Sequence, residues 1–225
     1  MTPEVRRHTD VLRELVAWPG RRLLEVGSGD GRLLGWAAAQ GADAVGLDPL
    51  HARPGPRHRP PGPPLVAGRG EALPFASGGF DLVLYFNSLH HVPLTEQWRA
   101  LAEAARVLAP EGELLVVEPL PEGEYFALLQ PIDDETEVRR EAYRAMHAAA
   151  ALGLRMAVEG RYASRIVEPS WPTLRARFLA VAPERAAAVQ AAGDEVAARF
   201  ARSGEPVEGG RAFIQPMRVN LLRRV

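Results

Sequence analysis

The chain has 225 residues and a formal net charge of −1, without the basic excess that is typical of nucleic-acid-binding proteins. It contains no cysteine and no lysine, which excludes disulfides, thiolate metal sites, cysteine nucleophiles and Schiff-base chemistry. The N-terminal stretch is charged, and no apolar run is long enough to span a bilayer. We therefore expect a soluble, cytoplasmic α/β protein with one sizeable core.

Residues 1–20 are predicted to form an N-terminal helix. Thr2 supplies a hydroxyl cap and Pro3 occupies the first helical position, which is a favourable way to begin a helix. An apolar stripe then continues until Pro19. The helix would either pack beside the sheet or cover a ligand, and His8 is expected to lie exposed on it.

A glycine-rich turn follows the first predicted strand, residues 23–26. A helix is predicted to begin near Arg32, so its N-terminal N–H groups would point toward the turn. The dinucleotide fingerprint G-x-G-x-x-G would require glycine at position 32, whereas this chain has G-x-G-x-G. The acid Glu25 lies within the strand. The residues of the predicted cradle are Gly27, Ser28, Gly29 and Gly31.

A second predicted strand, residues 44–48, ends in Asp48, about 20 residues after the glycine turn. An acid at this place can accept hydrogen bonds from both hydroxyls of a ribose. The alternative is an ordinary turn aspartate before Pro49. Residues 49–64 are too rich in proline for a regular helix, so we expect an irregular crossover whose arginines form either a docking patch or a solvated loop.

The continuously apolar residues 80–86 are predicted to form an interior parallel strand. Because ligands bind at the carboxyl ends of such strands, Tyr85, Phe86 and Asn87 should line the site. His91 is a candidate general base, with His90 beside it. The alternative is that both histidines are structural, and a metal site would lack a clear third ligand.

The remaining elements alternate in type. We expect helices at residues 98–108, 135–152, 171–181 and 183–203, and strands at 65–67, 113–117, 156–167 and 211–222. Aromatic residues near Tyr125 and Phe126 are candidates for an acceptor pocket. The helices between the last two strands would form a small cap.

Six motifs occur in an order that resembles class I S-adenosylmethionine-dependent methyltransferases. They are EVGSGDG at 25–31, Asp48, GEALPF at 70–75, FDLV at 80–83, LHHV at 89–92 and RVLAPEGEL at 106–114. The chain is similar to the small-molecule, quinone-biosynthesis-like (type-eleven) branch over residues 23–119. The resemblance implies a Rossmann-like, doubly wound, mostly parallel seven-stranded sheet with an antiparallel last strand.

The resemblance also implies a single domain over residues 1–225. Residues 1–20 would be a lid helix, residues 21–119 the cofactor-binding core, and residues 120–225 the substrate-side cap with the last two strands. The implied ligand is S-adenosyl-L-methionine, and no metal is implied. The implied cofactor contacts are Glu25, Gly27, Ser28, Gly29, Gly31, Asp48, Pro49, Glu71, Ala72, Tyr85, Phe86 and Asn87.

The implied activity is methyl transfer to a small molecule by in-line displacement, for which the protein mainly supplies positioning. Asn87 and His91 are the candidates for a catalytic role. The alternatives are a non-catalytic adenosylmethionine-binding protein and a nicotinamide-dependent oxidoreductase. Nucleic acid is not an expected partner, and a homodimer stays open.

Overall fold

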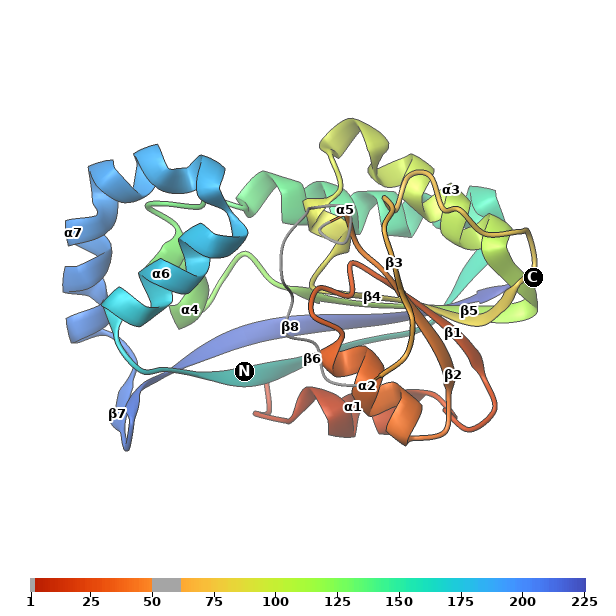
Figure 1. Ribbon diagram of the computed structural model, residues 1–225, viewed down its shortest axis with the longest axis horizontal. Helices are drawn as coiled ribbons and strands as arrows, with labels where there is room; N and C mark the ends of the chain where they lie inside the picture. The colour runs from red at the N-terminus through yellow and green to blue at the C-terminus, as the bar shows by residue number, and fades with distance from the viewer. Residues whose placement is uncertain (1–2, 50–61) are drawn as a thin grey trace. The chain divides into compact units, whose positions relative to one another are not determined.

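The computed structural model describes residues 3–49 and 62–225 (Figure 1). The chain separates into two compact units. Unit 1 comprises residues 1–8, 119–137 and 161–217, and unit 2 comprises residues 9–118, 138–160 and 218–225. No helix in the described ranges is both long enough and apolar enough to cross a bilayer.

Unit 2 contains the sheet that carries the glycine turn. Its strands lie in the order β3-β2-β1-β4-β5-β8-β6. The first five pair in parallel, from β3 at one edge to β5. The bounds are β1 Arg22–Val26, β2 Asp43–Leu47, β3 Leu65–Val66, β4 Phe80–Phe86, β5 Leu108–Pro119, β6 Leu154–Glu168 and β8 Gly210–Arg224, and the last two strands continue into unit 1.

The central strands of this sheet are buried on both faces. Residues 82–85 of β4 are almost inaccessible to solvent, as the apolar run predicts. The helices α1 His8–Leu15 and α2 Arg32–Ala39 lie on one face, and α3 Gln97–Val107 and α5 Thr136–Ala148 lie on the other (Figure 1). The short 3-10 helices η2 Leu89–His91, η3 Leu94–Glu96 and η4 Ala149–Leu152 adjoin the last two.

Unit 1 has a smaller apolar core of its own. Its helices are α4 Glu124–Leu129, α6 Trp171–Val181, η5 Pro183–Arg185 and α7 Ala186–Arg202, and β7 Glu205–Val207 forms a hairpin with β8. Leu128, Leu174, Val196 and Phe213 are fully or nearly fully buried where these elements meet. The helices α6 and α7 thus form the helical insert that the sequence predicts between the last two long strands.

The predicted helix over residues 1–20 is wrong at its N-terminal end. The backbone of Glu4 and Arg6 forms hydrogen bonds with Ala163 of β6, at 2.8 and 2.9 Å, and α1 begins only at His8. His8 is not freely exposed either, because its ring nitrogens lie 2.6 Å from the Tyr162 hydroxyl and 3.0 Å from the Ser164 hydroxyl. Burial lowers the pKa of His8. Pairing with β6 therefore outweighs the local capping signal.

The mostly parallel sheet with antiparallel final strands confirms the predicted fold class. The seven strands from β3 to β6 in the sheet order agree with the predicted number. The short strand β7, which forms a hairpin with β8, was not predicted. The long strands β5, β6 and β8 extend beyond their predicted bounds. Residues 50–61 of the proline-rich crossover lie outside the described residues.

Candidate functional site

The glycine turn is held close to the end of β2 by its own backbone. The N–H groups of Gly27 and Ser28 donate to the Leu47 carbonyl at 2.7 and 3.1 Å. Gly27 has φ of 79°, and a Cβ atom there would lie 2.4 Å from Cβ of Ser88. Only glycine fits this position, because any side chain would be strained and would collide with Ser88.

Gly29 faces open space instead. It has φ of 53°, and among the described residues other than its chain neighbours no heavy atom lies within 4 Å of the place where a Cβ would stand. Its N–H donates to Oδ2 of Asp48 at 2.9 Å. Asp48 follows β2 directly and is 7% exposed. The structure therefore brings the turn and the acid together, as the sequence predicts, beside a space that a ligand could fill.

Glu25 is a buried acid beneath the turn. It is 3% exposed, and its Oε2 atom has no hydrogen-bond partner among the described residues. Burial raises the pKa of Glu25 to about 8, with further contributions from the negative charges of Asp30 and Asp48, while a hydrogen bond from the Leu34 backbone opposes the rise. A buried acid with an unused oxygen and a raised pKa is typical of a functional site.

Two of the implied cofactor contacts, Glu71 and Ala72, follow β3. The backbone N–H of Ala72 donates to the Arg69 carbonyl at 3.1 Å, so residues 69–72 form a tight turn. The Glu71 side chain is 12% exposed and lies 3.7 Å from the Arg69 guanidinium, whereas Ala72 is exposed. Pro49, another implied cofactor contact, follows Asp48 after β2 and is also exposed.

The three residues predicted to line the site at the end of β4 differ in how far they are exposed to solvent. Tyr85 points into the core, where its side chain is fully buried and its hydroxyl donates to the Ala100 carbonyl at 3.3 Å. Phe86 is half-buried. Asn87 is exposed with φ of 52°, and its N–H donates to the Val117 carbonyl at 2.8 Å. Asn87 thus has the left-handed conformation, which asparagine adopts more readily than other non-glycine residues.

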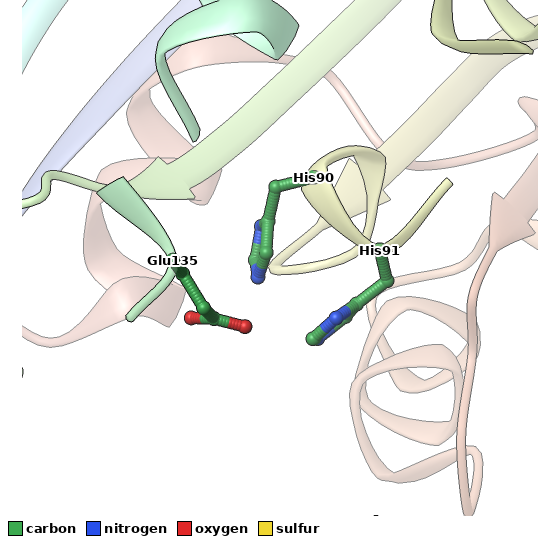
Figure 2. A group of neighbouring side chains, drawn as sticks. All are labelled: His90, His91 and Glu135. Carbon is green, nitrogen blue, oxygen red and sulfur yellow. The ribbon is translucent and has the colours of Figure 1, made fainter. Parts of the chain in front are cut away.

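The two histidines occupy different environments on η2 (Figure 2). His90 is 4% exposed, and its Nδ1 forms a hydrogen bond with the Glu118 carboxylate. His91 is exposed, with its ring centroid 4.1 Å from that of His90. Burial would raise the pKa of Glu118, but the charge of His90 and hydrogen bonds from His90 and Leu89 hold it below its usual value. Glu135, also labelled in Figure 2, belongs to unit 1.

The part that Glu118 plays was not predicted from the sequence. The only signal was an acid at the end of the strand that runs beside β4. Oε1 of Glu118 accepts hydrogen bonds from the backbone N–H groups of Ser88 and Leu89 at 3.1 and 2.9 Å. These contacts tie the turn after β4 to the end of β5.

A protein-family profile described as a methyltransferase domain matches residues 24–116. This segment is a methyltransferase domain. It contains the glycine turn, Asp48 and the end of β4. Curated relatives are also methyltransferases by name: a demethylmenaquinone methyltransferase of Renibacterium salmoninarum is 40% identical over 103 residues, which is 45% of this chain and 43% of the relative.

An uncharacterized methyltransferase of Mycobacterium marinum is 39% identical over 97 residues, which is 41% of this chain and 37% of the relative. The matched part thus spans less than half the length of these two relatives.

Solved structures share the fold across almost the whole chain. The YcgJ protein of Bacillus subtilis has a TM-score of 0.61 at 17% identity, and a putative methyltransferase of Bacillus halodurans has 0.60 at 16% identity. Each match covers 96% of this chain and 97% of the other. The cyclase SpnF has a TM-score of 0.58 at 20% identity and covers 96% of this chain and 79% of its own. At these low sequence identities the similarity shows a shared fold and nothing further.

Proposed function

We propose that the methyltransferase domain binds S-adenosylmethionine in the space beside Gly29 and transfers its methyl group to a small molecule. The observation that carries this proposal is the set of acids around the glycine turn. Glu25 and Asp48 are both buried there, and burial together with the negative charges of Asp30 and Asp48 raises the pKa of Glu25. A sulfonium and an ammonium group suit this negative surrounding.

The same charges disfavour a nicotinamide dinucleotide. Its pyrophosphate would have to approach the glycine turn, close to the negative charges of Asp30 and Asp48, where like charges repel. The position of a third fingerprint glycine is occupied by Arg32, whose guanidinium already lies 2.8 Å from Asp30. The acidic turn thus favours the methyl donor over the dinucleotide.

The residues present fit the donor in three respects. Glu25 has a buried oxygen that no described residue binds, and this oxygen would accept a hydrogen bond from the donor's ammonium group. Asp48, held by the Gly29 N–H, would accept from the ribose hydroxyls. The open space at Gly29 admits a ligand close to the backbone. The donor supplies an activated methyl group, so this chain needs no nucleophile of its own.

The protein's contribution to the reaction is positioning. Buried acids and a glycine turn of fixed conformation hold one reactant, and holding two reactants in alignment can lower a reaction barrier by roughly 7–11 kcal/mol. Asn87 lies exposed at the end of β4 and is our candidate for a contact with the acceptor. His91 is the candidate general base, to be used only where the acceptor loses a proton.

A small-molecule acceptor agrees with the charge of the chain, which lacks a basic excess, and with the relative named demethylmenaquinone methyltransferase. We infer that the protein acts in the cytoplasm on such an acceptor. The test is to incubate the protein with S-adenosylmethionine and a panel of small phenols, quinols, amines and carboxylates, and to measure S-adenosylhomocysteine.

Release of S-adenosylhomocysteine above the protein-free rate with at least one acceptor would support methyl transfer. A specific observation keeps a second candidate: the structural neighbour SpnF is named a cyclase. A protein that binds the donor tightly and releases no S-adenosylhomocysteine with any acceptor would instead be a donor-binding protein that uses the fold for another purpose.

A further inference from the structure

The turn after β4, residues 87–91, packs directly against the glycine turn within unit 2. Ser88 is 8% exposed, and its hydroxyl donates to the Val26 carbonyl at 2.6 Å. Its Cβ occupies the place that a side chain at Gly27 would need. A displacement of Ser88 would therefore change the surroundings of Val26 and Gly27, which form the beginning of the proposed donor site.

Glu118 holds this turn from the opposite side. It lies near the end of β5 and is 9% exposed. One carboxylate oxygen accepts from the N–H groups of Ser88 and Leu89, and the other forms a hydrogen bond with His90. Hydrogen bonds to an ionised acceptor are stronger than neutral ones, and three donors satisfy a charge that would be costly to bury alone.

The backbone conformation of the turn shows what these bonds maintain. Asn87 has positive φ immediately before the two N–H groups that Glu118 binds. Asparagine enters this region more readily than other non-glycine residues, and hydrogen bonds on either side hold it there. On one side of Asn87 its own N–H is bonded to Val117, and on the other side Glu118 binds the next two N–H groups.

We propose that Glu118 is a positioning residue for the donor site, acting through Ser88. Glu118 fixes the turn after β4, and the turn sets the position of the glycine loop and the direction of Asn87. The proposal rests on the proposed function, because it assumes that the glycine turn binds S-adenosylmethionine. The alternative is a buried carboxylate that contributes to stability alone.

The chain offers a matched control on the same strand. Glu113 is also 9% exposed, lies in β5, and forms ion pairs with Arg21 at 2.9 Å and Arg223 at 3.1 Å. It lies in the middle of β5 and pairs with Leu82 of β4, away from the turn that Glu118 binds. Glu113→Gln therefore removes a buried charge and its pairs from β5 without touching residues 87–91.

The experiment compares Glu118→Gln with Glu113→Gln, using S-adenosylhomocysteine as the calorimetric probe. Both substitutions should lower the melting temperature. We expect Glu118→Gln to weaken binding about tenfold or more, and Glu113→Gln to change it less than twofold. In nitrogen-15 NMR spectra of the ligand-free protein, the Ser88 and Leu89 amide signals should move and exchange faster with solvent only in Glu118→Gln.

Ser88→Ala is a second variant, for use also if Glu118→Gln does not fold. It removes the bond to Val26 while it keeps Cβ and the backbone N–H, and binding should weaken at least threefold. Wild-type affinity in either folded variant, or equal weakening by Glu113→Gln, would overturn the positioning role and leave the proposed function intact. A wild-type protein that does not bind the probe would overturn both.

Discussion

We expect the Glu25→Gln variant to be less stable than the wild-type protein at acidic pH and more stable than it at basic pH. In the folded protein the pKa of Glu25 rises from an ordinary 4.5 to about 8, mainly because the carboxyl is buried. A carboxyl whose pKa is raised by folding stabilises the protein most below its unfolded pKa, and this contribution is lost as pH rises through the folded value. The relevant window is therefore pH 4.5 to 8.

The size of the effect follows from the pKa. A tenfold change in proton affinity corresponds to about 1.4 kcal/mol, so the ionised Glu25 costs roughly 5 kcal/mol above pH 8. Glutamine avoids this cost at every pH, but its amide group would be a buried donor without a partner, which costs roughly 1–3 kcal/mol. The variant should be less stable than wild type at pH 5 and more stable, by at least about 2 kcal/mol, at pH 9.

Thermal unfolding in the absence of ligand measures this directly. For a chain of this size about 2 kcal/mol corresponds to roughly 4–8 °C in melting temperature, so Glu25→Gln should melt higher than wild type at pH 9 and lower at pH 5. A difference of the same sign and size at both pH values would refute the reasoning. It would mean that Glu25 does not change its protonation state in this range.

The Glu25 carboxyl should also change its protonation state when the donor binds. At pH 7 most of the free protein would carry a protonated Glu25, and an ammonium group beside it would favour the carboxylate. Binding of S-adenosylmethionine should then release a proton, so that the calorimetric enthalpy differs between phosphate and Tris buffers. The Glu25→Gln variant should bind about tenfold more weakly with a buffer-independent enthalpy. An enthalpy of wild type that is the same in both buffers would contradict a donor contact at Glu25.

The other predictions concern three further residues. Asp48→Ala should weaken donor binding by about 1.5–3 kcal/mol, the range for hydrogen bonds to charged groups, with a normal melting curve; an unchanged dissociation constant would reject the ribose contact. Asp81 has a pKa lowered to about 2, chiefly by its hydrogen bond with Arg22, so its contribution is present at neutral pH and is lost as pH falls toward 2. Because the pair is partly exposed, Asp81→Asn should cost at most about 1 kcal/mol at pH 7, and a loss that persists at pH 2 would contradict the assignment. His91→Gln should lower turnover less than tenfold, whereas a loss of about 100-fold that removes a histidine titration from the pH profile would make His91 the general base.

Local patterns predicted the elements of unit 2 well where burial and periodicity act together. The apolar run at 80–86 is β4, with the same bounds in the sequence and in the structure. The spacing from Gly29 to Asp48 correctly brought the two together, because parallel strands end at the same edge of a sheet. These features depend on neighbours in the sequence or on a topology that recurs in doubly wound sheets.

Contacts distant in sequence were the ones that the sequence did not reveal. Residues 4–6 pair with Ala163, so a favourable cap at Thr2 and Pro3 did not decide the structure of this segment. The aromatic Tyr85 was expected to face the ligand, but alternation along β4 places its side chain in the core under Ala100. Glu118 binds a turn about 30 residues away, which no local pattern indicates.

Calorimetric titration of the unmodified protein with S-adenosylmethionine, and separately with NAD, tests the central claim most directly. The buried acids at the glycine turn predict that S-adenosylmethionine binds with a dissociation constant in the micromolar range or below, on the order of −8 kcal/mol or tighter, and that NAD gives no measurable heat at the same concentrations. Micromolar binding of NAD without binding of S-adenosylmethionine would contradict the account.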